Sequence, residues 1–323
     1  MSKHFTKGLW VSMAMAAGAL AAHAQSYPAG PVTMIVPTSP GTSSDIVARA
    51  LSQRLVAKWN QPVVVDNKVG ASGTIGMGAV ARAPADGQTI LVVTNTISMI
   101  SPVQKDRGWS THDLKPVALM GTTVTALIVD PALPVKSVQD LIALAKSQPG
   151  KLNYASPGVR TPHHLYTELF KQISGTDIVH VAYKSTAGAV TDMAGGRVQL
   201  GFFPLNAVMP LVKGNKIRVL ATAGEQRSPT TPDVPTFSES NIEGVQAGSW
   251  IGIFVPKNTP AGIVDKLSAD ITAILKTQDF QQDLLRQEVI PNYRPEGPGQ
   301  LAALLQSDSA RWQTVIEKAK IVD

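Results

Sequence analysis

The chain has 323 residues, of which 44% are hydrophobic and 16% charged, so it holds enough apolar sequence for two domain cores and is neither disordered nor fibrous. Its formal net charge is +6, but lysine and arginine are scattered without a basic run, which argues against a nucleic-acid-binding protein. The absence of cysteine excludes disulfide scaffolds, thiolate metal sites and cysteine nucleophiles. Any metal site would have to use histidines and carboxylates alone, and we predict neither a metal nor a cofactor.

The first 24 residues have the pattern of a secretory signal peptide. Lys3 and Lys7 form a basic start, residues 8–22 carry no charge, and residues 22–24 read Ala-His-Ala, a small-x-small cleavage site. A membrane anchor would need about 20 apolar residues, and polar residues follow too soon. We predict that residues 1–24 are removed and that the mature protein reaches the bacterial periplasm.

After residue 31, short β-branched runs alternate with stretches of helical period. A helix with Val47, Leu51 and Leu55 on one face is predicted at residues 46–59. Strands are predicted at residues 32–36, 63–65, 90–94, 127–129, 153–156, 178–182, 198–202 and 217–222. This alternation predicts an α/β protein with mostly parallel sheets buried on both faces by helices.

Two apolar extended stretches, at residues 121–130 and 248–256, suggest places where the chain crosses between domains. Beyond them, only helices are predicted, at residues 261–275, 279–287 and 298–318, and these must pack on the N-terminal sheet. We predict that residues 25–124 and 251–323 form one lobe and residues 125–250 the other. The two crossing strands would form a hinge, with a ligand in the crevice between the lobes.

The segment at residues 38–45, TSPGTSSD, lies between a predicted strand and a predicted helix. The free N–H groups of a helix start bind an anion through backbone donors and the helix dipole. Alternatively, Ser44 or Asp45 only caps the helix, which we favour for Asp45 because its carboxylate would repel an anion. For the whole loop we favour ligand binding, because open α/β sheets bind ligands at the carboxyl ends of their strands. The candidate residues are Thr38, Ser39, Gly41, Thr42, Ser43 and Ser44.

A second strand-loop-helix unit is predicted at residues 154–164, YASPGVRTPHH. Ser156 and Gly158 stand at its turn. Arg160 is either a bidentate partner for a carboxylate or a solvated surface arginine. The adjacent His163 and His164 would point to different faces, so they do not form a metal pair, and we predict that His163 approaches the ligand.

Two further places at the ends of strands are less specific. Asn95 and Thr96 follow the strand at residues 90–94 and are either ligand residues or an ordinary turn. His180 lies in an alternating strand, so we expect it to be structural.

Enzyme motifs are missing from the sequence. It contains no G-x-S-x-G elbow, no H-E-x-x-H and no P-loop, and the G-x-G-x-x-A match at residues 76–81 does not directly follow a predicted strand. A periplasmic hydrolase that uses Ser43 or Ser156 with His163 stays an alternative class, and the missing elbow weighs against it.

Several blocks that run in order along the mature chain carry a more specific signal. They read YPAGPVTMIVPTSPGTSSDIVARAL, QPVVVDNKVGASGTIG, APADGQTILVV, KLNYASPG, HHLYTELF, DIVHVAYKSTAGAVTDMAGGRVQ and SPTTPDVPTFSE. Together with the signal peptide, they resemble the solute-binding proteins of tripartite tricarboxylate transporters, the Bug or TctC-like family. The resemblance covers essentially the whole mature chain.

The resemblance implies a two-lobed, type II-like periplasmic binding protein that is monomeric and performs no chemistry. Such a protein closes on a small carboxylate and delivers it to a membrane permease made of one large and one small subunit. In the family, the loops that match residues 38–45 and 156–164 grip one carboxylate, largely through backbone N–H and hydroxyl groups. A sensory partner that binds a membrane kinase when loaded would use the same closed state.

The sequence departs from the family pattern where the ligand is expected. Thr38, Ser39, Thr42 and Ser43 replace apolar or small residues of the first loop and add hydrogen-bond donors. Arg160 stands where the family usually has glycine.

A third departure lies at Phe203 and Pro204, which replace a common Asp-Asn pair, so amino-acid ligands become less favourable. These changes predict a dicarboxylate with one end at the first loop and Ser156, and the other at Arg160 or His163. Phe203 would pack on the spacer, which favours an aromatic diacid such as terephthalate over an aliphatic one by about 0.5–1.5 kcal/mol.

Overall fold

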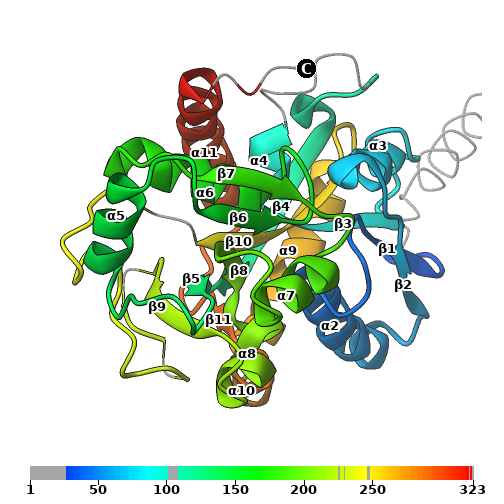
Figure 1. Cartoon of the computed structure of the whole chain (residues 1–323). Helices are drawn as coiled ribbons and strands as arrows, with labels where there is room; N and C mark the ends of the chain where they lie inside the picture. The colour runs from blue at the N-terminus through cyan, green and yellow to red at the C-terminus, as the bar shows by residue number, and fades with distance from the viewer. Residues whose placement is uncertain are drawn as a thin grey trace, which may run out of the picture.

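The computed structural model describes residues 27–100, 108–224, 226–228, 230–245, 248–319 and 321. The described chain forms two sheets flanked by helices (Figure 1), which confirms the predicted α/β class. The predicted signal peptide lies outside the described residues and stays a prediction.

The first sheet has six strands in the order β11-β4-β10-β3-β1-β2. Its strands are β1 (Val32–Val36), β2 (Val63–Asn67), β3 (Thr89–Thr94), β4 (Leu114–Thr123), β10 (Ser249–Pro256) and β11 (Val289–Pro291). The helices of this part of the chain are α2 (Ser43–Trp59), α3 (Thr74–Ala81), α4 (Thr96–Ile100), α9 (Ala261–Leu275), α10 (Gln278–Arg286) and α11 (Pro298–Lys318), with short 3₁₀ turns η1 (Ala71–Gly73) and η2 (Thr111–Asp113).

The second sheet has five strands in the order β7-β6-β8-β5-β9. Its strands are β5 (Thr125–Val129), β6 (Asn153–Ser156), β7 (Val179–Ala182), β8 (Leu200–Pro204) and β9 (Arg218–Thr222). The helices of this part are α5 (Val138–Ser147), α6 (Pro162–Ser174), α7 (Thr186–Ala194) and α8 (Leu205–Lys213).

The central strands of each sheet are buried on both faces, as their apolar runs predict, whereas the edge strands β2 and β7 are partly exposed. In β1, Met34 packs in the same core as Leu51 and Leu55 of α2, whereas its neighbour Ile35 packs with Met77 of α3 in a second core. Successive side chains of a strand point to opposite faces, so an uninterrupted apolar run supplies both cores. Among the helices that the structure describes, none is both long and apolar enough to cross a bilayer.

The sheets are mixed, which corrects the expectation that they are mostly parallel. Parallel pairing links β1 with β2 and β3, and β6 with β7 and β8. By contrast, β10 runs antiparallel to β3 and β4, and β5 runs antiparallel to β8 and β9. The reason is that strands at the crossings between the sheets enter in the opposite direction, a feature that a local apolar pattern does not encode.

The C-terminal third corrects two predictions, that it contains only helices and that these helices pack on the N-terminal sheet. It contains the three-residue strand β11, which pairs with β4 and is too short to give a periodic signal. The last helix, α11, begins on the first sheet through Leu301, but Trp312, Val315 and Ile316 near its end pack in a core of the second sheet. The helix therefore joins both halves of the molecule.

The chain passes between the sheets at two places. Val124 alone separates β4 of the first sheet from β5 of the second, and the return runs between β9 and β10. The predicted lobe boundaries near residues 124 and 250 fall at these crossings. The division into lobes and the hinge role of the crossings stay predictions.

Candidate functional site

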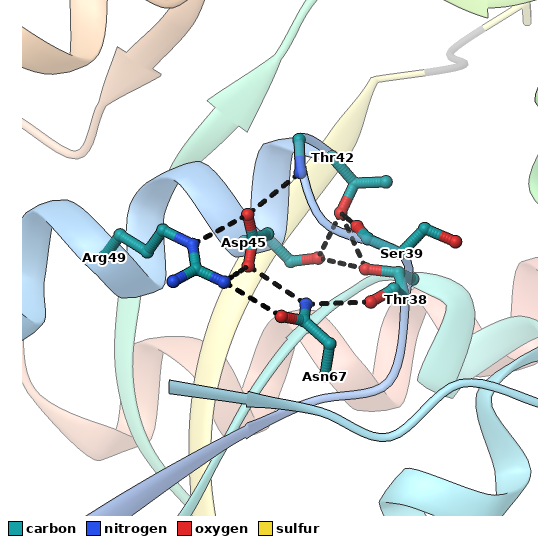
Figure 2. A network of polar contacts seen from close by, with 8 residues as sticks. Thr38, Ser39, Thr42, Asp45, Arg49 and Asn67 are labelled. Carbon is teal, nitrogen blue, oxygen red and sulfur yellow. Dashed lines mark hydrogen bonds and ion pairs between the residues drawn. The ribbon is translucent and has the colours of Figure 1, made fainter. Parts of the chain in front are cut away.

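The first candidate loop joins β1 to α2 and gathers hydroxyl groups at the N-terminus of that helix. Thr38 Oγ1 lies 2.7 Å from Thr42 Oγ1 and 2.9 Å from Ser44 Oγ (Figure 2). Thr42 Oγ1 also donates to the carbonyl oxygen of Ser39 at 2.9 Å. Gly41 has a φ of 82°, a conformation that glycine adopts without strain. The predicted residues of this loop therefore lie together around the start of α2.

Asp45 supports this loop from within the protein. Its carboxylate accepts from the Gly41 N–H and Asn67 Nδ2, both at 2.9 Å, and from Arg49 Nε at 3.0 Å (Figure 2). Burial by itself would raise the pKa of Asp45, but the hydrogen bonds from Arg49, Gly41 and Asn67 outweigh it and lower the pKa. The N-cap residue of α2 is Thr42, so Asp45 does not cap the helix as expected but orients the loop through the Gly41 N–H. That Asp45 does not bind the ligand stays a prediction.

The second candidate loop follows β6 and is tied to Ser156. Ser156 Oγ lies 2.6 Å from His180 Nε2, donates to the Gly158 carbonyl at 2.9 Å and accepts from the Gly158 N–H at 3.2 Å. The serine has no exposed surface. Contacts with Gly158 and His180 therefore surround the Ser156 hydroxyl, and they hold the loop that follows β6.

The histidine paired with Ser156 is His180, which corrects the pairing with His163 in the hydrolase alternative. His180 comes from the neighbouring strand β7, whose residues align with those of β6. Its structural role agrees with its alternating strand position. The sequence did not indicate the contact, because the two residues lie 24 positions apart and meet only through strand pairing.

Arg160 occupies a backbone conformation that suits glycine. Its φ is 65°, in the left-handed region, and its N–H donates to His164 Nδ1 at 3.0 Å. His164 in turn stacks on His180, with ring centroids 4.2 Å apart. Burial, followed by the nearby His180, lowers the pKa of His164 to about 4, so a neutral imidazole holds the loop at Arg160.

His163 points away from His164, as the sequence predicts for adjacent residues at a helix start. Its ring centroid lies 5.1 Å from that of Phe203, a fully buried residue at the end of β8. Within the described part of the chain, its buried Nδ1 has no hydrogen-bond partner. Burial lowers the pKa of His163 to about 4.

Asn95 lies in a buried network between the two sheets. Its Nδ2 donates to the Tyr166 hydroxyl at 3.0 Å, and its Oδ1 accepts from Ser249 Oγ at 2.7 Å. Both ends of the amide are therefore engaged. Thr96, the next residue, has its hydroxyl 2.8 Å from that of Thr94. A ligand role for Asn95 and Thr96 stays a prediction.

Asn206 is a residue at the site that the sequence interpretation missed. It is the second residue of α8, and its Nδ2 donates to Ser43 Oγ at 3.3 Å across the two halves of the molecule. Its position directly after β8 parallels that of Ser43 after β1. Its place near the carboxyl end of a strand is the sequence feature from which a ligand role for Asn206 could have been predicted.

No metal centre accompanies these residues: in the ranges that the structure describes, no group of three or more histidine and acidic side chains could hold a metal ion. A cavity of about 570 Å³ between α6 and α11 is lined by Leu169, Gln172, Ile173, Arg311, Thr314, Val315 and Lys318. It contains none of the predicted ligand residues, and the chemistry described above lies elsewhere.

The chain is similar to one family model and to several solved structures. The family model of the tripartite tricarboxylate transporter family receptor, TctC, matches residues 47–321. Among solved structures, Rpa4515 of R. palustris with adipate is 33% identical, with a TM-score of 0.83, and the match covers 91% of this chain and 98% of that one.

Two further structures are similar over nearly their whole length. The periplasmic binding protein BugD is 30% identical with a TM-score of 0.81, covering 92% of this chain and 99% of that one. MatC of Rhodopseudomonas palustris with bound malate is 28% identical with a TM-score of 0.80, covering 90% of this chain and all of the other, 100%. This chain belongs to the receptor family of the tripartite tricarboxylate transporters, whose Bug and TctC members are two-lobed periplasmic binding proteins.

Proposed function

We propose that this receptor captures a small dicarboxylate between its two lobes and delivers it to a tripartite tricarboxylate transporter. The observation that carries the proposal is the cluster of Thr38, Thr42 and Ser44 hydroxyls at the start of α2. Hydroxyl donors and the positive end of a helix dipole bind a carboxylate without a charged partner. The one acid beside them, Asp45, is compensated by Arg49.

Arg160 supports a second clamp for the far carboxylate. A left-handed conformation costs a non-glycine residue roughly 1–2 kcal/mol, and strained backbone of this kind clusters at ligand sites. An arginine at a position with a φ of 65° is explained if its guanidinium binds the ligand. The prediction that Arg160 or His163 receives the second carboxylate is therefore kept.

The spacer between the carboxylates is the finer part of the proposal. Phe203 is fully buried and its neighbour is the ring of His163, so a ligand would contact His163 before Phe203. The structural neighbours carry adipate and malate, which are aliphatic diacids. We place an aliphatic diacid first and an aromatic one such as terephthalate second.

The remaining parts of the proposal concern the setting. Export to the periplasm is supported by the signal-peptide pattern, and delivery to a permease of one large and one small subunit by family membership. We propose a monomer that performs no chemistry. The hydrolase alternative is disfavoured for Ser156, which has no exposed surface and donates to the Gly158 carbonyl. It is disfavoured for Ser43 because the hydroxyl of Ser43 contacts the amide of Asn206 rather than His163.

Titration calorimetry with C4 to C6 diacids and benzene mono- and dicarboxylates tests the proposal. We expect one diacid per chain. Thr42→Val should weaken the binding at least about tenfold. The Thr42 hydroxyl would turn from the Ser39 carbonyl to the bound carboxylate, and a hydrogen bond to a charged group contributes about 1.5–3 kcal/mol.

Thr314→Val, an exposed position on α11, is the matched control and should bind as the wild type does. Unchanged affinity in Thr42→Val would remove the hydroxyl cluster from the site. The sensory role would be favoured by two results together: the ligand-loaded protein induces uptake genes, and a strain in which the gene for this protein is deleted still grows on the diacid.

A further inference from the structure

Asn206 brings a side chain from the second half of the molecule to the N-terminus of α2. Helix α8 follows β8 without an intervening loop, and Pro204 at its start offers no side-chain cap. The Leu205 N–H donates at 2.8 Å to the carbonyl of Val124, the residue between β4 and β5. The start of α8 is thus held at the crossing between the sheets, and this fixes the place of Asn206.

The amide of Asn206 meets the first loop at Ser43. Its Nδ2 donates to Ser43 Oγ at 3.3 Å, and Ser43 is 7% exposed. Among the described residues, the Asn206 amide makes no hydrogen bond other than this one. A carboxamide has two N–H donors and one acceptor oxygen, so one N–H and the oxygen are available to a ligand beside Ser43.

The neighbours of Asn206 on its own chain segment cannot supply this donor. Phe203 is fully buried and apolar, and Pro204 has no N–H. Asn206 therefore supplies a polar side chain at the end of β8, next to the helix start that would receive a carboxylate. A carboxylate oxygen placed there can accept from groups of both halves at once.

We propose that Asn206 donates to the carboxylate bound at the N-terminus of α2 and so couples ligand binding to closure of the lobes. The inference rests on the proposed function and adds a specificity-determining residue to it. The Asn206 amide donates to Ser43 Oγ across the two halves of the molecule, and a carboxylate placed there can accept from both side chains. A ligand can close the lobes only through contacts that differ between open and closed states, and a contact made from the second lobe is of that kind.

The test compares Asn206→Ala, Asn206→Asp and the control Lys213→Ala by titration calorimetry with the diacid that the wild type binds best. Asn206→Ala should lose at least about tenfold in affinity, the size expected for a hydrogen bond to a charged group. Asn206→Asp should lose more, because its carboxylate repels the ligand and competes for the helix start. Lys213→Ala removes an exposed charge at the far end of the same helix and should stay within about twofold.

Small-angle scattering supplies the second measurement. The wild type should become more compact at saturating diacid, and Asn206→Ala should need a correspondingly higher concentration for the same change. Thermal unfolding without ligand should match the wild type, which separates a binding defect from a folding defect. If the wild type binds and Asn206→Ala binds and closes equally well, this inference is overturned while the proposed function stands. If the wild type binds no carboxylate, both are overturned.

Discussion

Two variants of Arg160 separate the effect of backbone strain on stability from the effect of the guanidinium on ligand affinity. Its φ of 65° costs a non-glycine residue roughly 1–2 kcal/mol. Glycine relieves that strain, but it raises the entropy of the unfolded chain by about 0.4–1 kcal/mol relative to alanine. Arg160→Gly should therefore be more stable than Arg160→Ala by about 1 kcal/mol, because both variants remove the guanidinium and only one relieves the strain.

Urea unfolding gives the stability, and titration calorimetry gives the affinity. Both variants should lose at least about tenfold in diacid affinity, since a charged hydrogen-bond partner is removed. Asn215→Gly is the matched control, because Asn215 also has a positive φ, of 53°, and is exposed at the end of α8. Its affinity should be unchanged. Equal stability of the two Arg160 variants would refute the strain argument, and undiminished diacid affinity would refute the clamp.

Three further predictions follow from buried groups. Burial lowers the pKa values of His163 and His164 from 6.5 to about 4, so the unfolded chain takes up protons before the folded chain does, and the free energy of unfolding should fall as the pH drops from about 6.5 to about 4. Urea unfolding across that range should lose this slope in the double variant His163→Asn/His164→Asn. An unchanged slope would contradict the prediction. Asp45→Asn should cost about 1–3 kcal/mol in urea unfolding, because Arg49 and Gly41 lose a charged acceptor, and a smaller loss would show that the loop does not depend on it. Trp312→Ala should cost about 3–5 kcal/mol in the same assay, and a loss near zero would contradict the packing of α11 in the core of the second sheet.

The strand-loop-helix units were predictable because their signals are local. The strand predicted at residues 32–36 and the helices at 261–275 and 298–318 have the bounds found in the structure. Their apolar period and their flanking glycine and proline residues act within one segment. The strand β4 was not predicted. The apolar stretch noted at residues 121–130 overlaps only its end, and its first residues include Lys115 and Pro116, which are unusual in a strand.

What the sequence could not show depends on segments that meet only after folding. The antiparallel entry of β10 follows from where the chain crosses, the Ser156–His180 pair from the register of β6 and β7, and the Asn206–Ser43 bond from the approach of the two halves. The first loop could be predicted as a site because its hydroxyls are close in sequence. Arg160 could be singled out by residue type, whereas its left-handed backbone appeared only in the structure.

Mass spectrometry of the small molecules released from the natively extracted protein tests the central claim most directly. The account predicts one small dicarboxylate per chain, displaced by an excess of the diacid that binds best in titration. A released molecule without a carboxylate would contradict the account. So would a folded protein that releases nothing and also binds no diacid when titrated.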